Sequence, residues 1–223
     1  MATAASRQLK IGAIIDKTLG VIEHSIAPSL IYVVVLGAAS AAVKYFSLGS
    51  TAILETLGVA LATMVVSIAA AYFLLDAMVE RTGVRTRGTG DMFLPYIGLS
   101  VLYSIAVGLG FIVVVIPGLL LMARWSIAQP LLVARGEGIM QSLGQSWEKT
   151  SGAEFKIIGA ALLLLLLPVA AVIACSVMFK PDDLLGIALG QLASSAATVI
   201  SLGMGVALYG MIEHAGDVAE PFR

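Results

Sequence analysis

The sequence predicts an all-α fold, a polytopic membrane helical bundle with six transmembrane helices and two amphipathic interfacial helices. Three observations predict it. Of the 223 residues, 59% are hydrophobic and 12% are charged, about half the charge of an average globular domain. Several apolar runs reach the length of about 18 residues that indicates a membrane-spanning helix. Strand-like alternation of apolar and polar residues is not apparent, which disfavours a β-barrel.

The predicted spans belong to a single integral membrane domain over residues 1–223. They lie at about 27–46, 51–79, 92–116, 119–134, 157–179 and 184–212. Crossing a hydrocarbon core of ~30 Å takes about 20 helical residues. The second and sixth spans are therefore long enough to tilt, whereas the fourth is short.

Pro117 and Gly118 predict a hairpin turn between the third and fourth spans. Proline cannot continue the helical hydrogen bonding, and glycine accepts the backbone angles of a tight turn. A single helix over 92–134 would be about 64 Å long at the helical rise, twice the hydrocarbon thickness. The two spans are therefore expected to be antiparallel.

Basic residues are concentrated on one side of this topology. Ten fall on the side of the termini and two on the other. The ten are Arg7, Lys10, Lys17, Arg81, Arg85, Arg87, Arg135, Lys149, Lys156 and Arg223, and the two are Lys44 and Lys180. Because cytoplasmic loops carry an excess of lysine and arginine, both termini are predicted to be cytoplasmic. Charges interrupt the N-terminal region, so a cleavable signal is not expected.

Two segments outside the spans have the periodicity of amphipathic helices, at about 8–25 and 138–150. In the second, Ile139, Leu143 and Trp147 recur every four residues. Such helices usually lie in the membrane interface, which tryptophan also prefers. The alternative is a cytoplasmic extension packed on its neighbours. A weak likeness between the two segments leaves an internal repeat open.

Arg124 is the one arginine within a predicted span, and Trp125 follows it. A charge at mid-membrane costs about 2.5–3.5 kcal/mol, and less towards the ends. Two explanations remain open. Arg124 pairs with Glu55, which lies at a matching depth in the second span, or it snorkels to the outer headgroups with Trp125 as an interfacial anchor.

Small residues recur along the sixth span at helical spacing. They are Gly186, Gly190, Ala193, Ala197, Ser201 and Gly205. Small faces allow helices to approach closely in lipid. The pattern predicts helix packing, either within the chain or in self-association.

The residues form no recognisable catalytic or ligand-binding motif. His24 and His214 lack a second ligand at metal spacing, and neither lies where it could activate a nucleophile inside the membrane. The single cysteine, Cys175, allows no intramolecular disulfide. We expect no enzyme activity, no cofactor and no metal, and the net charge of −1 argues against nucleic acid as a partner.

The segment Ile116–Gly152 resembles the glycerophosphoryl diester phosphodiesterase membrane-domain family, which includes YciC-like bacterial inner-membrane proteins. The matching elements are Pro117-Gly118, Arg124-Trp125, Pro130, Gly136 and Ser142-Leu143, Ser146-Trp147, Thr150 and Gly152. The resemblance implies a six-helix protein of the bacterial inner (cytoplasmic) membrane. The family's soluble catalytic domain has no counterpart here, so its activity is not carried over.

These observations favour a non-enzymatic membrane protein that acts as a scaffold or accessory subunit of a membrane complex. Its expected partners are membrane lipids and other membrane proteins or a second copy of itself. The alternative is a transporter or channel for a small solute or lipid.

Overall fold

The computed structural model describes residues 9–48, 53–85, 92–113 and 115–219. Within these ranges the regular structure is helical and contains no strand, which confirms the all-α class. The helices are α2 (Ile11–His24), α3 (Ile26–Ile31), η1 (Tyr32–Leu36, a π-helix), α4 (Gly37–Ser47), α5 (Ile53–Arg81), α6 (Phe93–Val113), α7 (Val115–Arg124), α8 (Ala128–Arg135), α9 (Ile139–Lys149), α10 (Glu154–Met178) and α11 (Leu184–Ala219).

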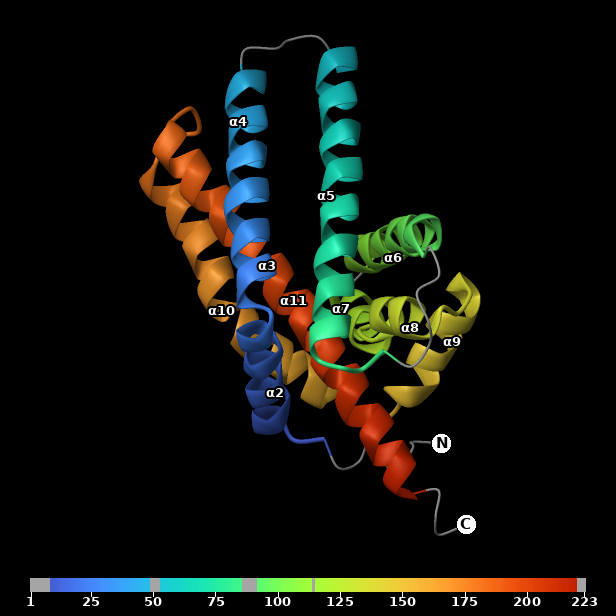
Figure 1. Ribbon diagram of the computed structural model, residues 1–223. Helices are drawn as coiled ribbons and strands as arrows, with labels where there is room; N and C mark the ends of the chain where they lie inside the picture. The colour runs from blue at the N-terminus through green and yellow to red at the C-terminus, as the bar shows by residue number, and fades with distance from the viewer. Residues whose placement is uncertain (1–8, 49–52, 86–91, 114, 220–223) are drawn as a thin grey trace.

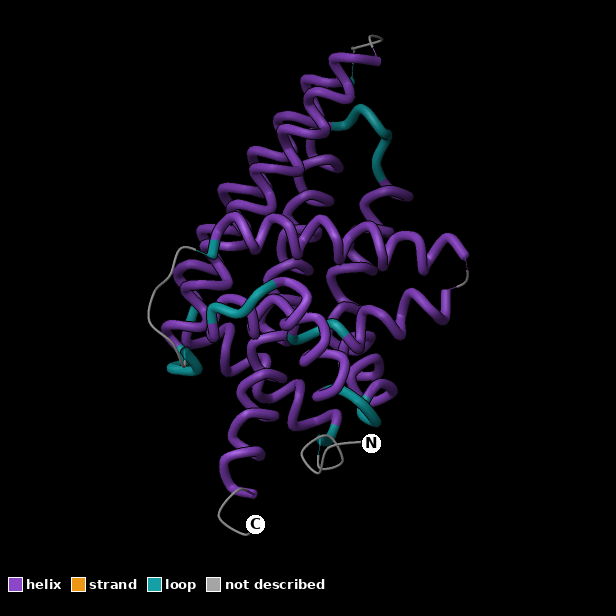
Figure 2. The backbone as a smooth tube through the Cα atoms, turned by 90° about the vertical axis from the view of Figure 1, so that its right-hand side faces the viewer, coloured by secondary structure: helices purple, strands orange, loops and turns teal. Residues whose placement is uncertain are grey.

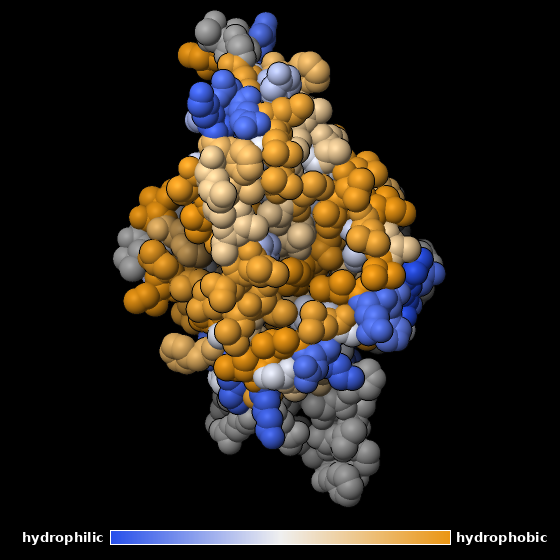
Figure 3. Space-filling model, turned by 90° about the vertical axis from the view of Figure 1, so that its left-hand side faces the viewer, coloured by the Kyte–Doolittle hydropathy of each residue, from blue (hydrophilic) through white to orange (hydrophobic). Residues whose placement is uncertain are grey.

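Six helical stretches in the described part of the chain are long and apolar enough to cross a membrane. They are Ile26–Ser47, Ile53–Arg81, Phe93–Ile112, Val115–Arg135, Glu154–Met178 and Leu184–Glu213. Every predicted span boundary lies within four residues of these ends. Figure 3 shows an apolar band between hydrophilic surfaces at the two ends of the molecule. The chain is a multi-pass membrane protein.

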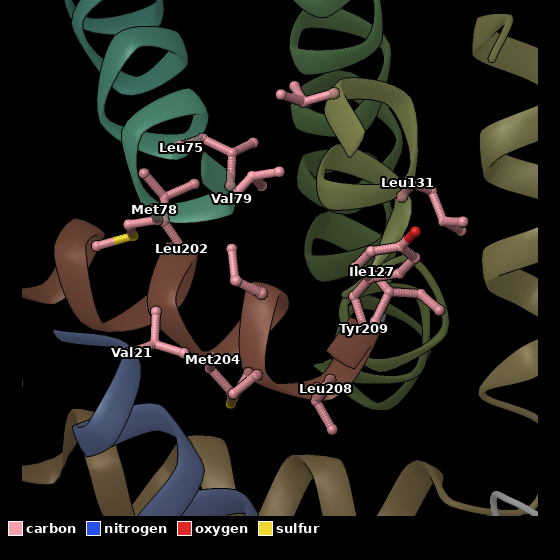
Figure 4. Packing of buried hydrophobic residues seen from close by; sticks show 14 of the residues in the cluster. Val21, Leu75, Met78, Val79, Ile127, Leu131, Leu202, Met204, Leu208 and Tyr209 are labelled. Atoms are coloured by element: carbon pink, nitrogen blue, oxygen red, sulfur yellow. The ribbon is translucent and has the colours of Figure 1, made fainter. Parts of the chain in front are cut away.

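Helix α11 is the centre of the bundle. It runs obliquely between α10, α2, α4 and α5 (Figure 1). Figure 4 shows side chains of α2, α5, the α7–α8 region and α11 converging on one core. Leu75 and Met78 of α5, Ile127 and Leu131 near α8, and Leu208 of α11 are fully buried there.

The predicted amphipathic helices exist, as α2 and α9. Helix α2 continues in the direction of α3 (Figure 1) and packs on α10 and α11. A Cβ atom added at Gly203 of α11 would lie 3.1 Å from Ile22, and one added at Gly159 of α10 would lie 3.1 Å from Ile11. The apolar face of α2 is thus used inside the bundle, which favours the packed extension over a helix lying flat in the interface.

Helices α6 and α7 form an antiparallel hairpin, as expected, but Pro117 and Gly118 do not lie between the two helices. Helix α7 already begins at Val115, so Pro117 and Gly118 lie in its first turn, where proline is well tolerated. The two helices approach closely: a Cβ atom added at Gly110 would lie 3.0 Å from the Cα atom of Gly118. In Figure 2 this hairpin runs across the direction that α4 and α5 follow.

At the end of the bundle away from the chain termini, α4 packs on α11, whereas α5 is separated from α4 (Figure 1). From Ile53 to Val66 every residue of α5 except Thr63 is exposed. The second half of the same helix supplies core residues. One helix therefore has a packed half and an outer half that touches little else in the chain.

Candidate functional site

The fourth predicted span is not one helix, because it breaks at residues 125–127. Pro130 has no backbone N–H, so it cannot donate to the carbonyl of Ser126 four residues earlier. Proline fits the first turn of a new helix, and α8 begins two residues before it. The free carbonyl of Ser126 and the ring of Pro130 both lie against Gly205 of α11; a Cβ atom there would be 2.9 Å from the carbonyl oxygen.

Because of this break, Arg124 is the last residue of the ten-residue helix α7 and lies at an interruption within the stretch Val115–Arg135. Its Nη2 atom lies 2.6 Å from Oε1 of Glu154, and its Nη1 atom donates to the carbonyl of Trp147 at 2.9 Å. The guanidinium also lies over the Trp147 ring, 4.9 Å from the centroid. The side chains of Arg124 and Glu154 are 16% and 13% exposed, so this is a mostly buried, charge-assisted contact.

Both explanations offered for Arg124 are therefore wrong. Its carboxylate partner is Glu154 at the start of α10, not Glu55, which is exposed in the first turn of α5. Snorkelling to the outer headgroups is also excluded, since the guanidinium contacts α9 and α10 at the end where basic residues gather. Both predictions assumed a continuous fourth helix.

The backbone carbonyl of Arg124 also forms hydrogen bonds with side chains of α9 and of the residue that follows it. Its carbonyl oxygen accepts hydrogen bonds from the Ser146 hydroxyl at 2.7 Å and from the Thr150 hydroxyl at 3.0 Å. The Glu154 carboxylate also accepts the Gly152 amide at 3.0 Å. We call Arg124, Ser146, Trp147, Thr150 and Glu154 the elbow cluster. Four of the five belong to the segment Ile116–Gly152, and the cluster gives those residues a structural role.

Trp125 does not lie where an outer anchor was expected. It occupies the break between α7 and α8, and its ring packs 6.3 Å from that of Tyr103 in α6. Trp147 is 40% exposed on α9, so one face of the ring meets Arg124 while part of the surface remains open.

A second group of charges ties α8, α9 and α11 together at the same end. Glu213 pairs with Arg135 and accepts from Lys149 Nζ at 3.0 Å, and Arg135 also lies 3.5 Å from Glu137. Burial lowers the pKa of the Lys149 ammonium, and the positive charge of Arg135 lowers it further. Arg85 forms an ion pair with Asp76 nearby in sequence.

The small residues of α11 make contacts inside the chain. A Cβ atom added at Gly186 would lie 2.4 Å from Phe179 Cβ, and one at Gly190 would lie 4.0 Å from Cys175. Gly205 meets the helix break described above. Ala193 and Ala197 are partly buried, and Ser201 is exposed with its hydroxyl donating to the Ala197 carbonyl.

Several cavities open on the described surface. One, of about 700 Å³, lies between α2, the end of α5 and α11. A groove of about 470 Å³ lies between α4 and the outer half of α5 and includes Glu55. A third, of about 360 Å³, includes Cys175 and Lys180 near the α10–α11 turn. His24 lines the first cavity, whereas the side chain of His214 is outside the described residues.

No group of three or more His, Cys, Asp or Glu that could hold a metal ion occurs among the residues the structure describes. Comparison with family models, with curated proteins and with solved structures finds no match to this chain. Membership of the glycerophosphoryl diester phosphodiesterase membrane-domain family remains a prediction.

Proposed function

We propose that this protein is a non-enzymatic scaffold or accessory subunit of a membrane complex, and that the outer half of α5 binds a transmembrane helix of another membrane protein. The observation that carries the proposal is the exposure of α5. Residues 53–66 are exposed on all faces except at Thr63, while the remainder of the helix enters the core.

The composition of this outer half suits a protein helix better than lipid alone. Gly58, Ala60 and Ala62 are small, and small residues let a second helix approach closely. Thr63 Oγ1 already donates to the Val59 carbonyl at 2.8 Å. The groove beside α4 also contains Glu55 and Thr56. A partner helix seated in this groove would lie beside both side chains.

Photocrosslinking in native membranes tests this proposal. A photoreactive phenylalanine derivative would replace Val59, which is 39% exposed in the groove. The matched control replaces Val169 on α10, which is 47% exposed. We expect a discrete protein adduct from position 59 and lipid labelling alone from position 169. Equal adducts from both positions, or none from position 59, would contradict the proposal, and an adduct of twice 23.1 kDa would identify self-association.

We further propose that the membrane is the bacterial inner membrane and that both termini are cytoplasmic. The distribution of basic residues supports this orientation. Arg124 lies at the same end of the molecule as the other basic residues, because its partner Glu154 lies near Lys156 at the start of α10. Reporter fusions at the C-terminus and after Gly49 test the orientation, and an external C-terminus would overturn it.

The second candidate is a transporter or channel for a small solute or lipid. The observation that favours it is that cavities open near both ends, the 700 Å³ cavity beside α2 and the 470 Å³ groove beside α4. Saturable flux into liposomes containing the purified protein would support this function over the scaffold.

A further inference from the structure

The cavity of about 700 Å³ between α2, α5 and α11 is lined by three basic side chains and no acidic one. Lys17 and His24 come from α2, and Arg81 comes from the last turn of α5. The rest of its lining is neutral: Gly20, Val21, Thr82, Val84, Val206, Ala207, Gly210 and Met211. Cations from two distant segments of the chain therefore meet at one opening.

Among the residues that the structure describes, Lys17 and Arg81 differ from their neighbours in having no carboxylate partner. Elsewhere at this end, Arg85 pairs with Asp76, Arg124 pairs with Glu154, and Arg135 and Lys149 share Glu213. In the described ranges, neither Lys17 nor Arg81 has an ion pair within 4.0 Å. Positive charge that the protein does not neutralise is thus concentrated at the cavity, and an anionic ligand would neutralise it.

The local geometry leaves donor groups for such a ligand. His24 Nδ1 is 2.8 Å from the Gly20 carbonyl, so in the doubly protonated ring Nδ1 donates to that carbonyl and Nε2 remains to donate to a ligand.

The cavity also lies where polar and apolar surfaces meet. Val21, Val84 and Val206 line one part of it. The helix that follows His24 exposes Ile26 and Leu30 at 56% and 58%. A ligand with a charged head and an apolar tail matches this combination, because basic pockets between membrane helices bind phosphate-containing headgroups.

We propose that Lys17, His24 and Arg81 form a binding site for a phosphate group, and that the phosphate belongs to the headgroup of an anionic phospholipid. The three side chains surround the phosphate oxygens with charge-assisted hydrogen bonds. The acyl chains follow the apolar surface of α3. This site is independent of the helix-binding role proposed for the outer half of α5.

Binding of fluorescent phosphatidylglycerol to the purified full chain, reconstituted in phosphatidylcholine nanodiscs, tests the site. The double variant Lys17→Gln, Arg81→Gln is compared with Lys10→Gln, Lys156→Gln, which removes the same charge at the same end but away from the cavity. Both pairs lose the same general attraction to an anionic surface, but only the first loses direct hydrogen bonds to the phosphate. Because a hydrogen bond to a charged group contributes at least about tenfold to binding, we expect the first pair to weaken binding about tenfold or more relative to the second. Equal losses in both pairs would overturn the proposal.

A second variant separates loss of binding from loss of folding. A Cβ atom at Gly20 meets nothing within 4 Å, so Gly20→Leu has room for its Cβ atom, extends a side chain into the cavity and favours the helix. Gly144→Leu on α9 is the matched control, since its Cβ atom also meets nothing within 4 Å. We expect only Gly20→Leu to weaken lipid binding. Unchanged binding in Gly20→Leu would overturn the site.

Competition with glycerol 1-phosphate distinguishes the two sources of the phosphate. Retention of the lipid at millimolar glycerol 1-phosphate would support the lipid headgroup as the ligand. Displacement by glycerol 1-phosphate would overturn the lipid assignment and leave a site for a free organic phosphate.

Discussion

The two halves of α5 lie in contrasting surroundings. The half that ends at Arg81 packs against α8 and α11, beside helices joined by ion pairs and by hydrogen bonds to backbone carbonyls. The half that begins at Ile53 is exposed on nearly every face and borders a groove shared with α4. The same helix thus contributes to a fixed core at one end and offers a largely free surface at the other.

This contrast separates stability from interaction. Substitutions near the basic end should change the stability of the isolated chain, because they disturb contacts between several helices. Substitutions in the outer half of α5 should leave that stability nearly unchanged, since few contacts are lost. Their effects should appear only when a partner helix is present.

The largest effect is expected at the elbow cluster. Arg124→Leu removes the partner of Glu154 and leaves that carboxylate mostly buried without its cation. Breaking a buried pair is costly, and the partial exposure of both groups reduces the loss, so we expect about 2–3 kcal/mol. The measurement is the free energy of unfolding of the purified protein in detergent.

A double-mutant cycle identifies the partner. Glu154→Leu in the Arg124→Leu background should recover part of the loss, because the unpaired carboxylate is removed. The effect of Glu55→Leu in the same background should simply add to the effect of Arg124→Leu, since Glu55 lies in the outer half of α5 and not at the packed end. Coupling to Glu55 and none to Glu154 would contradict the elbow cluster.

Two Gly→Ala substitutions test the contrast between the packed end and the outer half of α5. Gly205→Ala places a Cβ atom 2.9 Å from the Ser126 carbonyl oxygen, and overpacking of this kind should destabilise the protein by about 1–2 kcal/mol. Gly58→Ala on the outer half of α5 meets nothing within 4 Å. It should be neutral or stabilise by up to about 1 kcal/mol, because alanine favours the helix.

Thermal unfolding of both variants in detergent is sufficient for the comparison. Destabilisation by Gly58→Ala that equals the effect of Gly205→Ala would show that the outer half of α5 is packed after all.

The sequence predicted the features that depend on hydrophobicity along the chain. Span positions follow from apolar length, so all six agree with the structure within four residues. The small residues of α11 were also predicted to form a packing surface, although the sequence does not indicate which helix each residue contacts. These predictions required no knowledge of how distant segments pair.

The errors about Arg124 have one physical origin, the break between α7 and α8. Pro130 has no N–H to donate to the carbonyl of Ser126, so the predicted fourth helix cannot be continuous there. A continuous helix placed Arg124 near the outer end of the span and suggested Glu55 by depth alone. The true partner, Glu154, is 30 residues further along the chain, and no local pattern indicates that pairing.

The basic cavity was missed for a related reason. In the sequence, Lys17 and Arg81 indicate only the topology, because each, considered alone, is an ordinary basic residue outside the spans. They meet because α2 packs on α11 beside the end of α5. The only signal in the sequence was the amphipathic face of α2, and its apolar residues were assigned to the membrane interface.

The smallest expected effect concerns Lys149, at the edge of the packed end. Its folded-state pKa is lowered from the usual value of 10.5 by burial and by Arg135. Between the folded and unfolded pKa values the unfolded state binds more protons, so the free energy of unfolding contributed by this group rises with pH across that window. Lys149→Gln abolishes the titration. The wild type should therefore gain stability relative to the variant, by less than about 1 kcal/mol, as the pH increases towards 10.5. Unfolding of both proteins at a series of alkaline pH values measures this difference. If the stability of the wild type relative to the variant instead falls as the pH rises, Glu213 holds the Lys149 ammonium in its charged form. The ion pairs of Glu213 with Arg135 and Lys149 would then stabilise the packed end in the same way as the elbow cluster does.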